Sequence, residues 1–368
     1  MLLLREKLVI IDKTTSNSLM IANLIATVLV IAIHYNSKVY IQPAEFGGWN
    51  YLFQEFALNG VARISVPFFA MLSGFFIASK LTNKKNYTSI LKNRAKTLLL
   101  PYLIAAIVIY LASTGIQWAV QHESFQRITT ISFIINATLH PVSDQFWFLR
   151  DMIILTVLSP LLLNSEKKHF TPIALTFFVL WFINYQPLPL FFGWHLISIE
   201  TLLFFTLGGV LFEKRNLLSS LIKTNLKNKF FVLFFWLFLL LVRVYLDPEL
   251  NVWYTQEYNL FHIALYKLAI IFGIISLMQF SIYLSTNKLL IYLSGLTFFV
   301  YLFHLLPISY ARILTPKIIS REYSFYIDYP IVLISIFVSA HFIAKFMPNI
   351  FILITGGRTP INALKRQM

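Results

Sequence analysis

The chain has 368 residues, of which 58% are hydrophobic and only 12% are charged, and its mean hydropathy is +0.72. Soluble domains carry about 25% charged residues, so this composition excludes a soluble protein and predicts a surface that mostly faces lipid. The chain has no cysteine, which excludes disulfides, thiolate catalysis and Cys-ligated zinc. The net charge of +15 comes from basic residues between apolar segments, which indicates membrane topology and no nucleic-acid partner.

The chain contains ten apolar segments, each near the ~20 residues needed to cross the hydrocarbon core of a bilayer. They predict an all-α, polytopic integral membrane protein that forms a single domain over residues 1–368, with short tails at about 1–17 and 348–368. The fifth segment is the weakest because it ends in a Pro-x-Pro sequence. In chain order the expected helices are 18–37, 57–79, 97–114, 146–164, 172–188, 193–212, 229–246, 259–283, 289–309 and 328–347.

The distribution of Lys and Arg predicts the orientation of these helices. An even number of crossings places both ends of the chain on one side, and that side receives 21 of the 30 basic residues. Because cytoplasmic loops carry the excess of Lys and Arg, both termini are predicted to be cytoplasmic. The Lys-, Asn-, Ile- and Phe-rich composition is typical of a bacterial chain, so we expect a multi-pass protein of a bacterial plasma membrane.

Ionisable side chains within apolar helices are costly and usually functional. In the predicted topology the ionisable and polar residues toward the extracytoplasmic side form an outer set. This set includes His, Arg and carboxylates, the groups needed for proton transfer and anion stabilisation. An inner set is basic, as an anion site would be, so we expect one chamber that has a basic mouth toward the cytoplasm. The outer set is His34, Arg63, Arg150, Asp151, His195, Glu200, Arg243, Lys267, Tyr301 and His304, and the inner set is Arg94 and Lys96.

Several of these residues also have a structural explanation. Arg63 and Arg243 could each extend the guanidinium to the membrane surface, and Arg150 and Asp151 could form an ordinary interfacial ion pair. Glu200 lies inside an apolar helix and therefore needs a partner, for which Lys267 is the candidate.

Motifs of soluble enzymes are missing from the sequence. It has no phosphate-binding Gly-rich loop, no His-Glu-x-x-His and no Gly-x-Ser-x-Gly. Ser73-Gly74 lies within an apolar helix, so its structural interpretation is a notch of small residues where helices pack closely.

One run of residues resembles a motif of acyltransferase family 3, whose membrane proteins acylate cell-surface carbohydrates. The run, Arg63-Ile-Ser-Val-Pro-Phe-Phe-Ala-Met-Leu-Ser-Gly-Phe-Phe76, is similar to the family's Arg-x-x-Val-Pro-x-Phe-Phe-x-x-Ser-Gly-Phe/Tyr pattern. The resemblance covers essentially the whole chain and implies ten helices with cytoplasmic ends. Weaker pieces occur in the family's order: a first helix ending in His34, then Arg94 to Tyr102, Phe146 to Asp151, and Phe299 to His304.

The resemblance also implies roles for individual residues. His34 matches a first-helix His that acts on the acceptor hydroxyl, and Arg94 matches the first Arg of an Arg-x-x-Arg pattern linked to the acyl-CoA donor. The further matches are Arg63, Arg150 after Trp147-Phe-Leu, and Tyr301 with His304. The chain departs from the family pattern at three positions, where Asn23 and Thr97 replace usual Arg residues and Gln145 replaces a frequent His.

These features predict transfer of an acetyl or similar short acyl group from cytoplasmic acyl-CoA, as co-substrate, to a hydroxyl of a cell-envelope polysaccharide or glycolipid. A thioester needs no metal, and we expect neither a metal nor a bound cofactor. His34 would be the general base, and Arg63 or Arg150 would stabilise the oxyanion. Arg94 and Lys96 would hold the CoA phosphates, and the other substrate contacts would come from Trp147, Glu200, Arg243, Tyr301 and His304.

Three alternatives stay open. A covalent acyl-enzyme on His34 or Ser73 could replace direct transfer. The chain could instead be an exporter or flippase of a polysaccharide or lipid-linked sugar, since helix count and a polar chamber fit that function equally well. The substitutions at Asn23 and Thr97 also keep open a relative that does not catalyse.

Overall fold

The computed structural model describes residues 11–35, 47–82, 86–121, 143–163, 170–191, 194–250 and 259–365. Within these ranges the chain is helical, apart from the short antiparallel strands β1 (Leu190–Phe191) and β2 (Trp194–His195). The predicted all-α fold is therefore confirmed for the part of the chain that is described. The expected tail at 1–17 lies mostly outside it.

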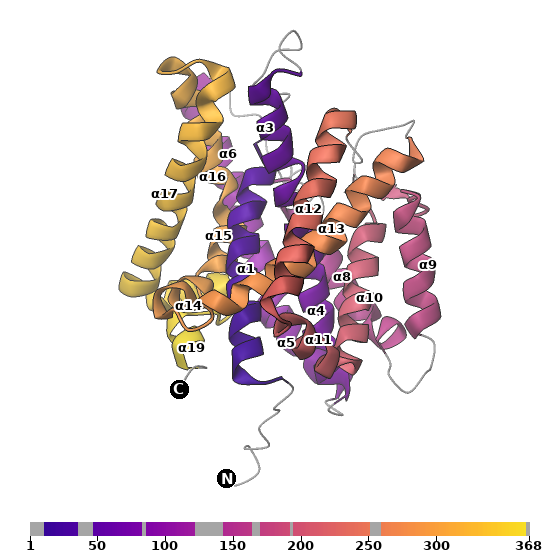
Figure 1. The fold of residues 1–368 in the computed structure, drawn as a ribbon. Helices are drawn as coiled ribbons and strands as arrows, with labels where there is room; N and C mark the ends of the chain where they lie inside the picture. The colour runs from indigo at the N-terminus through magenta and orange to yellow at the C-terminus, as the bar shows by residue number, and fades with distance from the viewer. Residues whose placement is uncertain are drawn as a thin grey trace.

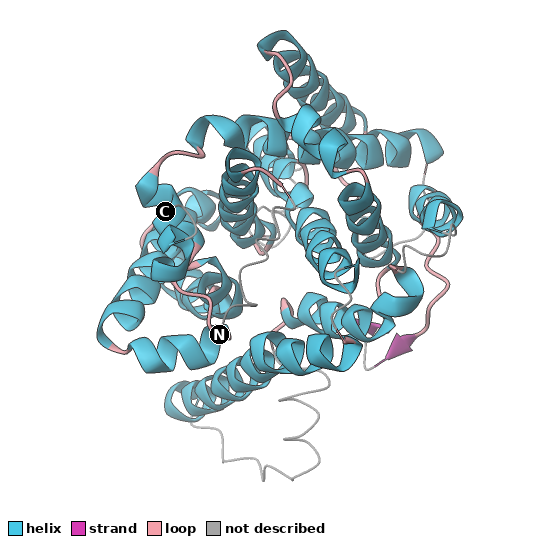
Figure 2. Cartoon of the chain, turned by 90° about the horizontal axis from the view of Figure 1, so that it is seen from below, coloured by secondary structure: helices cyan, strands magenta, loops and turns pink. Residues whose placement is uncertain are grey.

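The helices form one bundle around a common apolar core (Figures 1 and 2). In chain order they are α1 (Lys13–Ile33), α3 (Trp49–Leu58), α4 (Ser65–Thr82), α5 (Tyr87–Arg94), α6 (Leu100–Gln121), α8 (Phe146–Leu162), α9 (Phe170–Phe182), α10 (Ile199–Glu213), α11 (Arg215–Ile222), α12 (Leu226–Leu246), α13 (Leu260–Ser281), α14 (Lys288–Ser294), α15 (Thr297–Phe303), α16 (Leu305–Leu314), α17 (Ser324–Phe346), α18 (Pro348–Thr355) and α19 (Pro360–Lys365).

Six of the described helical segments are long and apolar enough to cross a membrane, or seven if the bent segment of α15 and α16 is one crossing. The expected spans near 146–164, 172–188 and 193–212 correspond to α8, α9 and α10, which have 17, 13 and 15 residues. These helices are shorter than the ~20 residues of a full crossing. The chain is a multi-pass membrane protein, and the count of ten crossings stays a prediction.

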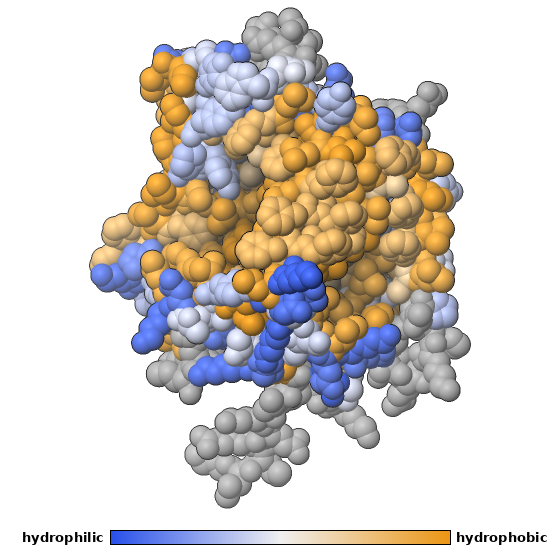
Figure 3. Space-filling model, in the orientation of Figure 1, coloured by the Kyte–Doolittle hydropathy of each residue, from blue (hydrophilic) through white to orange (hydrophobic). Residues whose placement is uncertain are grey.

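The surface has the polarity expected of a membrane protein. Figure 3 shows apolar residues across the middle of one face and hydrophilic residues gathered along its lower edge. Exposed side chains follow one side of α12 at helical spacing, namely Phe231, Phe234, Phe238 and Leu241. The start of α1 and the pair α18–α19 lie at the same end of the bundle (Figure 1), as an arrangement with both ends on one side requires.

Two predicted helices differ from their expected form. The helix expected at 97–114 begins earlier, at Tyr87, because α5 continues through a π-helical segment, Ala95–Leu99, into α6. The helix expected at 289–309 is broken into α14, α15 and α16, and the chain bends by 52° between Phe303 and Leu305. Both irregularities occur beside residues that the sequence marks as functional, Arg94 and His304.

α4 and α10 pack with their backbones in direct contact. A Cβ atom added to Gly74 would lie 1.9 Å from the carbonyl oxygen of Phe205, and one added to Gly208 would lie 2.0 Å from that of Met71. Only glycine fits at either position, because the obstacle is backbone that a rotamer change cannot move. The predicted packing notch at Ser73-Gly74 is confirmed.

We predict that Gly208→Ala destabilises the protein by about 1–3 kcal/mol, because its methyl group must push α4 away from α10. Gly209→Ala is the matched control, since its Cβ would meet only the end of the Leu163 side chain, at 2.5 Å. The thermal unfolding midpoint of the detergent-purified variants measures both effects. Equal shifts for the two variants would contradict this packing arrangement.

The segment after α17 is folded onto the bundle. Phe351 of α18 is buried and stacks on Phe299 of α15, with ring centroids 5.7 Å apart. Gly356 then ends α18 in the left-handed conformation, at φ +60°, and turns the chain back toward α6. The expected tail at 348–368 is therefore helical over Pro348–Thr355 and Pro360–Lys365 and contributes to the interior.

Candidate functional site

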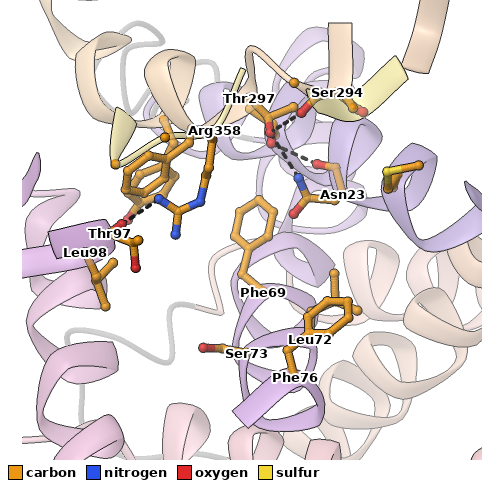
Figure 4. Close-up of a pocket in the computed structure, with 18 of the residues that line it drawn as sticks. Asn23, Phe69, Leu72, Ser73, Phe76, Thr97, Leu98, Ser294, Thr297 and Arg358 are labelled. Atoms are coloured by element: carbon orange, nitrogen blue, oxygen red, sulfur yellow. Dashed lines mark hydrogen bonds between the residues drawn. The ribbon is translucent and has the colours of Figure 1, made fainter. Parts of the chain in front are cut away.

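A cavity of about 590 Å³ lies at the end of the bundle where α1 begins. Its walls come from α1, α4, the π-helical segment before α6, α8, the junction of α14 and α15, and the turn between α18 and α19 (Figure 4). Along α4 the lining residues recur at helical spacing, so one face of this helix is turned to the cavity. Those residues are Phe69, Leu72, Ser73, Phe76 and Lys80.

The charged residues that line the cavity are all cations. They are Lys80, Arg94 and Arg358, and the described lining contains no Asp or Glu. Three positive charges without a carboxylate give the cavity a positive potential and make it suited to a multiply charged anion.

Arg94 is presented to the cavity by the irregular helix from α5 to α6. Arg94, Thr97 and Leu98 are three and four residues apart, so they share one helical face, and all three line the cavity. The Nε atom of Arg94 has no hydrogen-bond partner within the described part of the protein. Because a buried guanidinium N–H is costly to leave unpaired, this atom favours an anionic ligand at that position.

Arg358 enters the cavity from the C-terminal turn. Its Nη1 donates hydrogen bonds to the carbonyl oxygens of Thr97, at 2.6 Å, and Thr355, at 3.0 Å. The guanidinium carbon lies 3.9 Å from the ring centroid of Phe298, a cation–π contact. Figure 4 shows the guanidinium between Thr97 on one side and the Asn23–Thr297 pair on the other.

Two departures from the family pattern lie in this same cavity. Asn23 of α1 donates a hydrogen bond from Nδ2 to Thr297 Oγ1 at 3.1 Å, and Thr97 accepts the bond from Arg358. Lys96, which was predicted to bind phosphate beside Arg94, is exposed and does not line the cavity. Sequence reasoning missed Arg358, although a Gly-Gly-Arg-Thr-Pro sequence directly after an apolar helix was a signal for a tight, charged turn.

An aromatic layer closes the deep end of the cavity. Tyr301 packs edge-on against Phe69 and Phe148, with ring centroids 6.1 and 6.2 Å away, and all three line the cavity. The Tyr301 hydroxyl donates to the carbonyl oxygen of Gln145 at 2.6 Å, which fixes the ring in place.

His34 and His304 face each other beyond this layer, with ring centroids 4.9 Å apart. His34 lies seven residues after Thr27, the last residue of α1 that lines the cavity, which is roughly 10 Å further along the helix axis. Neither imidazole lines the cavity described here. The cavity described here therefore reaches the layer around Tyr301 but not the two imidazoles.

The surroundings of His304 define which of its ring nitrogens carries a proton. Nδ1 lies 2.9 Å from the carbonyl oxygen of Tyr301, which can only accept, so Nδ1 must be the donor. In the neutral ring Nε2 is then a proton acceptor, and it is buried without a hydrogen-bond partner in the described structure. Arg312, which the sequence analysis did not single out, donates to the backbone carbonyl of the neighbouring His34.

Arg63 and Arg243 lie in a buried cluster apart from the cavity. Arg243 is fully buried, with Nη1 3.9 Å from a Glu55 carboxylate oxygen and Nη2 donating to the Asn59 carbonyl at 2.8 Å. Arg63 hydrogen-bonds to Tyr266. Arg63 also lies within electrostatic reach of His34. The substrate-binding role of Arg243 stays a prediction.

Glu200 and Lys267 each contact the side chain of Trp181 and do not form a direct ion pair with each other. Trp181 donates from Nε1 to the Glu200 carboxylate at 2.9 Å, and the Lys267 Nζ atom lies 4.6 Å from the Trp181 ring centroid. Lys267 also donates to Asn184 Oδ1 at 3.1 Å. The substrate role predicted for Glu200 stays untested by this arrangement.

Arg150 and Asp151 bind separate partners in a region that ties α8 to α10. Arg150 donates to the backbone carbonyl of His195, and Asp151 accepts from Ser198 N at 3.0 Å and Thr201 Oγ1 at 2.6 Å. Trp147 does not line the cavity, whereas Phe148 and Leu149 do. The roles predicted for Arg150 in catalysis and for Trp147 in binding stay predictions.

Comparison with known proteins places this architecture in a family. The Acyltransferase domain of acyltransferase family 3 matches residues 19–345. The chain belongs to acyltransferase family 3. The match extends from within α1 to the end of α17 and includes the aromatic layer, both imidazoles and most, but not all, of the cavity lining.

A curated relative supports this membership over nearly the full length. The chain is 26% identical to the "Succinoglycan biosynthesis protein ExoH" of Rhizobium meliloti (strain 1021), and the alignment covers 94% of this chain and 92% of the relative. No solved structure matches the chain. The protein is thus a membrane acyltransferase by family.

We predict that Arg243→Gln destabilises the protein by about 3–5 kcal/mol, because it leaves the Glu55 carboxylate buried without its cation. Arg215→Gln is the control, since Arg215 is exposed at the start of α11. Thermal unfolding of the purified variants measures the difference. An Arg243→Gln protein with normal stability and a raised KM for the acceptor would contradict the structural role and favour substrate binding.

Proposed function

We propose that this protein transfers an acetyl group from acetyl-CoA to a hydroxyl of an extracytoplasmic or lipid-linked polysaccharide. Membership of acyltransferase family 3 supports acyl transfer. The observation that carries the choice of donor is the cavity lined by Lys80, Arg94 and Arg358, whose described lining holds no Asp or Glu. The phosphates of CoA are the anion that such a cavity suits, because guanidinium groups bind phosphate oxygens in paired geometry.

The proposed orientation follows from the charge distribution. Lys80 lies at the end of α4, Arg94 at the end of α5 and Arg358 near the C-terminus, on the side that the Lys and Arg excess assigns to the cytoplasm. CoA would enter there, and its thioester arm would extend between α1 and α4 toward Tyr301. The cavity volume of about 590 Å³ is within the range of small-molecule sites.

The proposed chemistry is direct attack of a sugar hydroxyl on the thioester carbonyl. His34 accepts the hydroxyl proton as the oxygen–carbon bond forms, and Arg63 stabilises the negative charge that develops on the carbonyl oxygen. Collapse of the tetrahedral intermediate breaks the carbon–sulfur bond, and the protonated imidazole returns its proton to the departing thiolate. The products are the sugar ester and free CoA.

His304 supports His34 in this proposal. Its Nε2 atom is an acceptor of defined tautomer, and its ring lies beside that of His34. It can therefore share the proton that His34 takes up, which stabilises the charged intermediate state. The layer formed by Tyr301, Phe69 and Phe148 must rearrange so that the thioester reaches the two imidazoles, and it keeps water from the donor when no acceptor is bound.

The acceptor class is proposed from the relative. The name of this relative refers to the biosynthesis of succinoglycan, and the alignment leaves little of either chain uncovered. A bacterial plasma membrane has cytoplasmic CoA on one side and growing envelope polysaccharide on the other, which the two ends of this site would face.

We predict that His34→Ala and His304→Ala each lower acetyl transfer by a factor on the order of 10² to 10⁴, the usual contribution of a positioned base. The assay uses protein reconstituted in liposomes, acetyl-CoA labelled in the acetyl group, and polysaccharide from the bacterial envelope. His262→Ala is the control, because His262 pairs with Asp247 at 2.9 Å outside the site.

Label transfer that survives His34→Ala would overturn the catalytic assignment. Wild-type protein that moves polysaccharide across the liposome membrane and transfers no label would identify an exporter instead.

A further inference from the structure

The segment Gly356–Asn362 forms one wall of the cationic cavity, and we call it the C-terminal hook. Four of its residues besides Arg358 line the cavity, namely Gly356, Gly357, Thr359 and Asn362. It lies outside residues 19–345, the part of the chain that the family domain matches. The hook therefore adds a surface to the cavity that the domain itself does not supply.

Two glycines fix the hook against the bundle. A Cβ atom on Gly356 would lie 2.6 Å from the Cα of Thr97, and one on Gly295, between α14 and α15, would lie 2.6 Å from the Cα of Pro360. The hook is thus in backbone contact with the π-helical segment on one side and with the α14–α15 junction on the other. Because these contacts hold the hook on two sides, the backbone position of Arg358 has little freedom.

The guanidinium of Arg358 is oriented before any ligand binds. It is bonded through Nη1 to two carbonyl oxygens and stacked on Phe298. One of these carbonyls belongs to Thr97, which shares a helical face with Arg94. The two guanidinium groups therefore border the same cavity from elements far apart in the sequence.

We propose that the C-terminal hook is the phosphate-binding wall of the donor site and that Arg358, together with Arg94, binds the diphosphate of the acyl carrier. This inference rests on the proposed function, because it assumes a phosphorylated thioester donor. Paired guanidinium groups match the two adjacent phosphates of a diphosphate, and a fixed, stacked Arg loses little side-chain entropy on binding.

The test compares two donors that share the thioester arm, acetyl-CoA and S-acetyl-pantetheine, which lacks the phosphates. For Arg358→Ala we expect the KM for acetyl-CoA to rise at least about tenfold, the loss of a charged hydrogen bond, while the KM for S-acetyl-pantetheine stays the same. Arg215→Ala is the matched control: Arg215 is also stacked on a Phe, at 5.6 Å from the Phe212 ring centroid, but does not line the cavity.

Arg358→Lys provides the same comparison if the alanine variant does not fold. It keeps the charge but lacks the planar guanidinium that stacks on Phe298 and binds phosphate oxygens in pairs, so a smaller selective increase is expected. An equal effect on both donors, or none on either, would overturn the assignment while leaving the proposed function intact if wild-type protein uses acetyl-CoA.

The experiment also separates the donor from a lipid as the source of phosphate. Nanodiscs of phosphatidylcholine alone should show the full effect of Arg358→Ala. An effect that appears only when phosphatidylglycerol is added would assign the hook to a lipid headgroup and overturn the proposal. Wild-type protein that uses neither donor would overturn the proposed function and this inference together.

Discussion

A charged side chain inside a membrane protein needs a partner, either another protein group or a ligand. Apolar surroundings alone do not compensate for the free energy of desolvating an isolated ion. This constraint separates the two groups of ionisable residues in the structure. Glu55 is paired with Arg243, and the Glu200 carboxylate accepts from Trp181, so these carboxylates have protein partners. Three cations line the cavity, whose described lining holds no Asp or Glu, and this positive environment suits an anionic ligand.

The spatial order of the site follows from the same constraint. In the proposed function, an anionic donor would be held where the cations are, at one end of the bundle, while the imidazoles of His34 and His304 in the apolar interior would transfer the proton. The aromatic layer around Tyr301 separates the two environments. Such a separation allows an acyl group, which is uncharged, to cross while the charged carrier remains on its own side.

The sequence predicted the helical class, the packing notch at Gly74 and the location of Arg94, because hydropathy, small residues and a motif are local properties. It did not predict the break at His304 or the early start of α5, since both depend on how distant segments pack. Arg358 was missed because its role arises from a turn that brings the C-terminal segment to Thr97, a contact across 261 residues. The same long-range packing decides which polar residues line the described cavity, and no count of polar residues could show that His34 and His304 are not among them.

The central claim is that the cationic cavity opens to the cytoplasm and binds acetyl-CoA, and the accessibility of the cavity tests it most directly. Because the chain has no cysteine, one introduced cysteine can report this accessibility. Ser73 lines the cavity on α4, so Ser73→Cys can be labelled with a membrane-impermeant maleimide in vesicles of either orientation. The account predicts labelling from the cytoplasmic side that acetyl-CoA slows. Labelling from the outer side alone, or at a rate that acetyl-CoA does not change, would contradict it.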